Sequence, residues 1–200
     1  MEGILPPQLS PFILAILGRM SIKITYFVHG TTTDNEENLS SGWNDVALSE
    51  LGEKQSEELT DKTSQHSFDA VFTSDLSRAF NSARITWGDK YKIVQDKRLR
   101  ECNYGDLNGK SSGIVELLQE KSVDTPMPNG ESYEQVKARI ADFLDDLKKN
   151  YDGKHIAIVA HKAPQLALDV LLRGMTWEQA FAGDWRKAKK WQPGWEYKLN

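Results

Sequence analysis

Short apolar runs alternate with longer amphipathic segments along the chain, and this alternation predicts most of its secondary structure. The runs are rich in β-branched and aromatic residues, which are typical of strands. One of them, HIAIVA (155–160), is apolar almost throughout, as expected for a strand that is covered on both faces of a sheet. Strands are predicted at residues 22–28, 69–74, 91–95, 155–160 and 194–199.

Between these runs, apolar residues recur at helical spacing, and capping residues mark where several helices begin. Ser49 is a predicted N-cap, and Ser132 with Gln135 three residues later forms a capping box. Thr176 and Gln179 repeat this pattern. Helices are therefore predicted over 11–18, 49–64, 75–87 and 112–121, from Ser132 onward, and over 164–173 and 177–189, with a loop over 98–110.

Strands that alternate with helices indicate an α/β fold, here a three-layer α/β/α sandwich with a mainly parallel sheet. We expect a single domain over residues 1–200, in which residues 1–19 form an N-terminal extension. Ligands of such sheets bind beyond the carboxyl ends of the strands. His29, Ser74 and His161 each end or follow a predicted strand, so we expect them to meet at one edge of the sheet.

Composition and charge narrow the class of protein. The chain has 200 residues and a formal net charge of −4, which argues against nonspecific binding to nucleic acid. Its single cysteine, Cys102, excludes an intrachain disulfide and favours a reducing cytoplasm. The apolar run at 11–18 is too short to span a membrane, and the four histidines lack the spacing of metal ligands. We therefore expect a cytoplasmic protein with no metal, membrane or nucleic-acid partner.

Four separated stretches carry the candidate chemistry, each at the end of a predicted strand or in a loop beside one. They are FVHGTTTDN (27–35) with the following GWNDVALSELGEKQ (42–55), FTSDLSRAFNSA (72–83), LRECNYGDLNG (99–109) and IVAHKAP (158–164). Together and in this order they resemble the histidine phosphatase superfamily, the group of phosphoglycerate mutases and small acid-type phosphatases. The resemblance runs from about residue 22 to 172 and implies a phosphoglycerate mutase-like fold.

The resemblance also implies a phosphohistidine intermediate and assigns candidate site residues. His29 matches the family's nucleophile, whose imidazole nitrogen attacks phosphorus and later leaves to water. Glu101 matches the proton donor, and His161 matches the second histidine, which stabilises charge on the transferring phosphoryl group. The positions that match the family's phosphate contacts are Arg78, Asn35 and Gly30. No metal or organic cofactor is implied.

The chain departs from the family's pattern at three positions. Val28 stands where the family has an arginine before the nucleophile, so the site lacks one fixed positive charge. Lys162 follows the second histidine, where a small residue is usual, and its ammonium group could cross to the pocket and replace that charge. A solvent-facing lysine is an equally weighted alternative. Thr31 stands where the family often has a glutamate after H-G, which makes the entrance of the pocket less acidic.

A tryptophan-rich segment with a basic stretch, RKAKK (186–190), lies near the C-terminus. The favoured interpretation is a solvated helix face with aromatic residues buried beneath it. The alternative is a flap that covers the pocket and offers stacking surface to a substrate's ring. The tryptophans of this segment are Trp177, Trp185, Trp191 and Trp195.

These features predict a phosphomonoesterase that hydrolyses a small phosphorylated metabolite through a phosphohistidine on His29. A phosphoglycerate mutase-type phosphotransferase is the near alternative. About fifty residues separate Glu101 from the last core strand, which leaves little room for the insertion that captures a sugar acid in the family's mutases. A catalytically weak phosphate-binding or scaffold protein is a third possibility, and Val28 is the residue that favours it. Neither the substrate's identity nor the oligomeric state is indicated.

Overall fold

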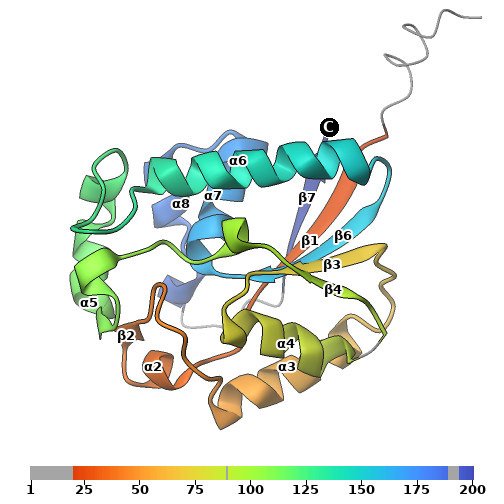
Figure 1. Cartoon of the computed structure of the whole chain (residues 1–200), viewed down its shortest axis with the longest axis horizontal. Coiled ribbons are helices and arrows are strands. Elements are labelled where there is room, and N and C mark those ends of the chain that lie inside the picture. Colours follow the sequence, from red (N-terminus) through yellow and green to blue (C-terminus); the bar gives the residue numbers. More distant parts are fainter. Residues whose placement is uncertain (1–19, 89, 189–193) are drawn as a thin grey trace, which may run out of the picture.

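The structure is a computed structural model that describes residues 20–88, 90–188 and 194–200. Five strands form its main sheet in the order β4-β3-β6-β1-β7 (Figure 1). The first four of these strands run parallel, and β7 pairs antiparallel with β1 at one edge. The strands are β1 (Ile22–Val28), β3 (Ala70–Thr73), β4 (Ile93–Gln95), β6 (His155–Ala160) and β7 (Trp195–Leu199).

Helices cover both faces of the sheet, so the predicted three-layer α/β/α sandwich is confirmed (Figure 1). On one face lie α3 (Glu50–Lys62) and α4 (Ser77–Trp87). On the other lie α6 (Tyr133–Asn150), α7 (Lys162–Arg173) and α8 (Trp177–Ala182).

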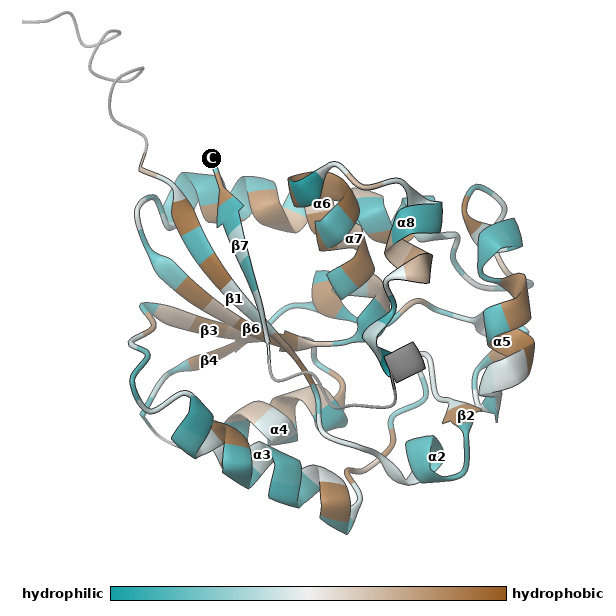
Figure 2. Ribbon diagram, turned by 180° about the vertical axis from the view of Figure 1, so that it is seen from behind, coloured by the Kyte–Doolittle hydropathy of each residue, from teal (hydrophilic) through white to brown (hydrophobic). Residues whose placement is uncertain are grey.

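Alternation along the central strands divides the core into two halves. Side chains of a strand point to opposite faces in turn. In β1, Tyr26 and Val28 belong to the cluster under α6 and α7, whereas Phe27 belongs to the cluster under α3 and α4. In β6, Ile158 and Val159 divide in the same way. Both faces of these strands are therefore apolar, and Figure 2 shows them brown along the centre of the sheet.

Smaller elements gather beyond the carboxyl ends of the strands (Figure 1). A short second sheet pairs β2 (Leu39–Ser40) with β5 (Lys110–Ser111). Around it lie α2 (Thr33–Glu36), α5 (Ser112–Leu118) and the 3₁₀ turns η2 (Gly105–Leu107) and η3 (Glu120–Ser122). Two further 3₁₀ turns are η1 (Lys97–Leu99) and η4 (Trp185–Ala188).

The strands predicted at 22–28 and 155–160 are confirmed at both ends, and Ser49 and Ser132 are N-caps as predicted. Helix α7 begins at Lys162, two residues before the predicted start at Pro164. A proline is tolerated in the first turn of a helix, where its missing N–H would have no partner within the helix, so Pro164 does not mark the start. The helix predicted over 177–189 is wrong. It ends at Ala182, and Asp184 then accepts a hydrogen bond from the Arg186 N–H as the 3₁₀ turn begins.

The helix predicted at 11–18 lies outside the described residues, and the single domain over residues 1–200 stays a prediction. None of the described helices combines the length and the apolar character that crossing a membrane requires.

Candidate active site

The carboxyl ends of β1 and β6 bring two histidines together. Val28 and Ala160 are partners in the parallel register, so the next residue of each strand leaves the sheet at the same level. The His29 N–H donates to the Ala160 carbonyl oxygen at 3.0 Å. The rings of His29 and His161 then meet edge to face, with centroids 5.0 Å apart.

The hydrogen bonding of His29 fixes which ring nitrogen can act as a nucleophile. Its Nδ1 lies 2.6 Å from the Gly30 carbonyl oxygen, which can only accept, so Nδ1 carries the proton and Nε2 keeps its lone pair. Burial, together with the nearby Arg78 cation, lowers the pKa of His29 to about 3. The imidazole is therefore neutral at physiological pH, as a nucleophile must be.

Gly30 is required by close packing of the backbone. A Cβ at this position would lie 2.3 Å from the Gly52 carbonyl oxygen on α3. Its N–H donates to Ser82 Oγ at 2.9 Å and is thus already used within the protein. The structure places Gly30 behind the nucleophile, where it fixes the turn that presents His29.

His161 is completely buried behind His29. Its Nε2 lies 2.6 Å from Ser74 Oγ, which also accepts the Leu76 N–H at 3.3 Å. The hydroxyl proton of Ser74 is then free for Nε2, which leaves Nδ1–H as the donor of His161. Within the described part of the chain, this buried Nδ1 has no hydrogen-bond partner. Burial and the positive charge of Arg78 hold the pKa of His161 well below its usual value, so its ring is neutral as well.

Arg78 supplies a buried positive charge from the first turn of α4. Its side chain is almost fully enclosed, with 2% of the residue exposed. Two of its N–H groups donate to the carbonyl oxygens of Gly42 (2.6 Å) and Asn44 (2.8 Å). Burial lowers the pKa of the guanidinium group, and Glu101 opposes that shift. The remaining N–H groups of Arg78 are the ones that could face an anion at His29.

The Glu101 carboxylate lies against the N-terminus of α7. Its two oxygens accept backbone N–H groups from Lys162 at 3.2 Å, Ala163 at 2.9 Å and Cys102 at 2.8 Å. Free N–H groups and the helix dipole make a helix N-terminus a favourable place for a carboxylate. The contact joins the loop after η1 to the strand end that carries His161.

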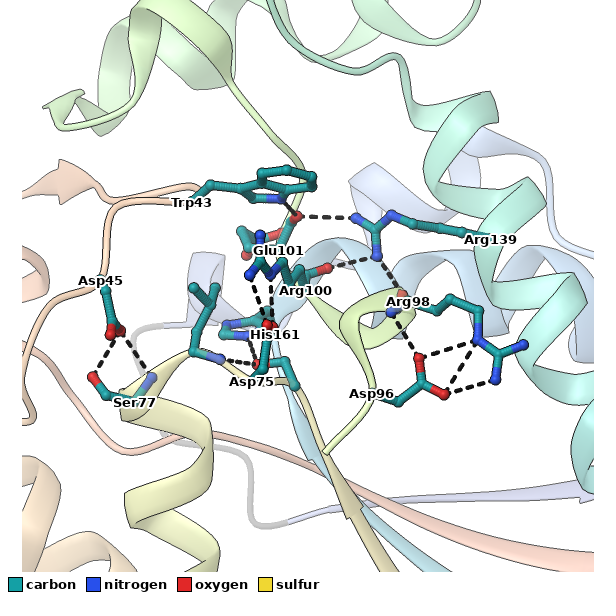
Figure 3. Close-up of polar contacts among 12 residues, drawn as sticks. Trp43, Asp45, Asp75, Ser77, Asp96, Arg98, Arg100, Glu101, Arg139 and His161 are labelled. Atoms are coloured by element: carbon teal, nitrogen blue, oxygen red, sulfur yellow. Dashed lines mark hydrogen bonds and ion pairs between the residues drawn. The ribbon is translucent and has the colours of Figure 1, made fainter. Parts of the chain in front are cut away.

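A clamp of two residues on and before α6, Arg139 and Glu131, holds the loop that carries Glu101. The Arg139 guanidinium donates to the carbonyl oxygens of Arg98, Arg100 (2.7 Å) and Glu101 (2.9 Å) (Figure 3). It also forms an ion pair with Glu131 at 3.0 Å. Glu131 in turn accepts the Asn103 N–H at 2.8 Å. The sequence analysis did not identify this clamp, because its arginine lies mid-helix with no motif beside it.

Trp43 adds a further contact to the backbone carbonyl group of Glu101. Its indole N–H donates to the Glu101 carbonyl oxygen at 2.7 Å (Figure 3). The backbone of Glu101 is thereby held from two sides, by a helix and by the loop that also covers Arg78.

Lys162 is buried and not solvent-facing, with 6% of the residue exposed. Its ammonium group lies 3.7 Å from the carboxylate of Asp184, which is itself buried and bonded to Arg186 at 2.8 Å. Burial lowers the pKa of Lys162 to about 8, with Arg186 adding to the shift and Asp184 opposing it. Val28 and Lys162 line the same cavity.

The cavity has a volume of about 620 Å³. Asn35 lies at its edge as the third residue of a capping box, in which its Oδ1 accepts the Thr32 N–H and thus leaves the amide N–H groups of Asn35 free. The lining residues are Val28, His29, Thr31, Asn35, Asn38, Gln55, Glu101, Ser112, Glu116, Gln119, Glu120, Lys162, Phe181, Asp184, Trp185 and Arg186.

The predicted site residues therefore fall into two groups. His29, Glu101, Asn35 and Lys162 line the cavity, whereas the remaining three are not among its lining residues. Those three are Arg78, His161 and Gly30.

The C-terminal tryptophans do not share one role. Trp177 packs in the core against Tyr133, Trp195 lies in β7, and Trp185 with Arg186 lines the cavity. The alternative of a segment that covers the pocket therefore fits Trp185 better than a solvated helix face does. Lys189 and Lys190 of the basic stretch, and Trp191, lie outside the described residues.

The model of the histidine phosphatase superfamily, branch 1, matches residues 26–189. Since this match covers most of the sequence, the chain belongs to the histidine phosphatase superfamily. Fructose-2,6-bisphosphatase TIGAR of Xenopus tropicalis is 38% identical over 135 residues, which are 62% of this chain and 49% of that protein. The chain thus spans about half the length of this relative.

Further relatives and solved structures agree with this family. The 2,3-bisphosphoglycerate-dependent phosphoglycerate mutase of Cytophaga hutchinsonii is 32% identical over 146 residues, 66% of this chain and 68% of that one. The α-ribazole phosphatase from Shigella flexneri superposes with a TM-score of 0.71 at 25% identity, over 80% of this chain and 84% of that one. A phosphoglycerate mutase from Bacillus anthracis superposes with a TM-score of 0.68 at 22% identity, over 78% of this chain and 82% of that one. The predicted phosphoglycerate mutase-like fold is confirmed.

Proposed function

We propose that the protein is a phosphomonoesterase that hydrolyses a small phosphorylated metabolite through a phosphohistidine on His29. The observation that carries the proposal is the state of this residue. Its Nδ1 is held by the Gly30 carbonyl oxygen, its ring is neutral, and its side chain lines a cavity shared with Glu101. A neutral imidazole with a free Nε2 can attack phosphorus.

The reaction proceeds in two displacements. His29 Nε2 forms a bond to phosphorus while the ester oxygen leaves, and Glu101 protonates that oxygen. Water then attacks the phosphohistidine, gives its proton to Glu101 and releases phosphate, which restores His29. Arg78, His161 and Asn35 stabilise the charge on the transferring group, and Lys162 adds to them in place of an arginine before the nucleophile.

Formation of the intermediate is the direct test. Brief mixing with a ³²P-labelled phosphomonoester should label the protein with a bond that is labile in acid and stable in base. His29→Ala should abolish the label, whereas the matched control His66→Ala should keep it. Label that persists in His29→Ala would show that another residue is the nucleophile.

The names of the relatives favour two related activities. TIGAR and the α-ribazole phosphatase are named for phosphate-ester hydrolysis, whereas the Cytophaga relative is named as a mutase. Hydrolysis predicts that inorganic phosphate is released in proportion to substrate consumed. A mutase would instead return the phosphoryl group to a sugar acid, so rapid interconversion of 2- and 3-phosphoglycerate without phosphate release would overturn the proposal. A scaffold protein would show neither reaction.

We also infer a cytoplasmic setting, since the single cysteine of the chain, Cys102, is a buried free thiol. Fractionation of cells that express the protein at native level would test this inference.

A further inference from the structure

Part of the cavity lining, here called the far wall, differs in chemistry from the residues of the reaction centre. Near His29 lie the groups that would hold a phosphoryl group. The far wall comes from α5 with η3 and from the end of α8 with η4. Its lining side chains are Ser112, Glu116, Gln119, Glu120, Phe181, Asp184, Trp185 and Arg186.

Both described cations of the cavity lining are already paired with carboxylates. The ammonium group of Lys162 lies 3.7 Å from Asp184. The guanidinium group of Arg186 lies 2.8 Å from Asp184 and 2.8 Å from Glu116. Against these two cations the described lining carries four carboxylates, Glu101, Glu116, Glu120 and Asp184. Counted over the described residues, the far wall therefore carries excess negative charge.

The same wall offers hydrogen-bond acceptors. Glu120 is exposed, and its side chain forms no hydrogen bond or ion pair with another described residue. The amide N–H of Gln119 donates to the Tyr133 hydroxyl group at 3.0 Å, which leaves Oε1 of Gln119 as an acceptor. Hydroxyl groups are the uncharged donors that such a wall can bind, and a carboxylate can accept from two at once. The indole ring of Trp185 adds an apolar surface beside them.

We propose that the substrate of this site is a phosphomonoester whose remaining part is rich in hydroxyl groups and lacks a second anionic group. This inference rests on the proposed phosphatase function and names its substrate class. A second phosphate or carboxylate group at the far wall would meet Glu116 and Glu120, while Arg186, the described cation of that wall, stays bound to Asp184 and Glu116. A polyol or sugar chain meets acceptors and an aromatic ring instead.

A pair of substrates that differ only at the far end tests this directly. Sorbitol 6-phosphate and 6-phosphogluconate share the same leaving oxygen and the same four central hydroxyl groups, but one ends in a hydroxymethyl group and the other in a carboxylate. We expect kcat/KM for sorbitol 6-phosphate to be at least tenfold higher, about 1.4 kcal/mol. Hexyl phosphate, which lacks the hydroxyl groups, should also fall at least tenfold below sorbitol 6-phosphate.

A charge reversal tests whether the far wall causes the preference for sorbitol 6-phosphate over 6-phosphogluconate. Glu120→Lys should reduce the ratio of kcat/KM between the two substrates at least tenfold. Because both values come from one preparation, the ratio does not depend on the fraction of folded enzyme. Glu57→Lys is the matched control, since Glu57 is an exposed glutamate of α3 outside the cavity lining, and it should leave the ratio unchanged.

Binding separates this inference from the proposed reaction. Calorimetric titration of both compounds into His29→Ala measures the preference without turnover. If no phosphate is released by the native enzyme but sorbitol 6-phosphate still binds more tightly, the reaction is wrong and the substrate class stands. Equal or better binding and turnover of 6-phosphogluconate would overturn the substrate class, as would an equal effect of Glu57→Lys and Glu120→Lys.

Discussion

Two neighbouring residues, Val28 and Lys162, decide how much positive charge the reaction centre holds. Val28 is buried at the end of β1, at the position where the family pattern described in the sequence analysis has an arginine. Lys162 begins α7 and lines the same cavity, with its ammonium group directed to the carboxylate of Asp184. A donor aimed at developing charge is worth about 2.7–4 kcal/mol in such sites. A valine at this position should therefore reduce transition-state stabilisation by a similar amount unless Lys162 supplies the missing charge.

We expect Lys162→Met, which keeps the length of the stem, to lower kcat/KM at least tenfold, or about 1.4 kcal/mol. Val28→Arg alone should gain little, because the charge is already present, but it should recover part of the loss in the Lys162→Met background. A double-mutant cycle measures this coupling, with Lys54→Met on the exposed side of α3 as a control. Additive effects would show that Lys162 does not replace the arginine.

Glu101 has a role that can be tested through the leaving group. Glu101→Gln removes the proton but keeps the shape of the side chain. General acid catalysis contributes about 10²–10⁴-fold, so hydrolysis of alkyl phosphates should fall by that factor. Phosphorylation by p-nitrophenyl phosphate, which has a good leaving group, should be slowed much less, as stopped-flow release of nitrophenol would show. An equal loss on both esters would exclude Glu101 as the proton donor.

At the scale of elements, the sequence predicted the parts of the site that depend on strands. Apolar alternation located both ends of β1 and β6, and the register of parallel strands then placed His29 beside His161. It could not predict the clamp on Glu101. That contact joins α6 to three carbonyl groups of a loop, and backbone carbonyl groups leave no trace in a side-chain pattern.

The clamp should act on catalysis through Glu101. Arg139→Ala frees the loop on both sides of this residue, so we expect at least a tenfold loss of kcat/KM on alkyl phosphates. The loss on p-nitrophenyl phosphate should be smaller, as for Glu101→Gln, and Arg139→Lys should restore little because one ammonium group cannot bind three carbonyl groups. Lys137→Ala on the same helix is the control. A loss that is equal on both esters would indicate general destabilisation instead.

At the scale of the whole molecule, the cavity is assembled from segments that are far apart in the chain. Asp184 joins Lys162 at the strand edge to Arg186, which reaches Glu116 of α5. No spacing or periodicity in the sequence indicates that these four charges meet. The break after Ala182 brings Asp184 and Arg186 to the cavity, and this break was missed because the capping pair and the composition of 177–189 both favour a continuous helix.

The neutral state of His29 also affects the stability of the whole protein. Its pKa is about 3 when folded, against about 6.5 for an ordinary histidine, so between these values the unfolded chain binds more protons. The free energy of unfolding therefore falls as the pH falls below 6.5, by about 1.6 kcal/mol between pH 6.5 and 5 for this residue. His29→Gln should lose this contribution. Urea denaturation at several pH values in that range should therefore show that the free energy of unfolding changes less with pH in the variant than in the native protein. If the two proteins lost stability equally, folding would not lower the pKa of His29, and burial would not be what keeps its ring neutral.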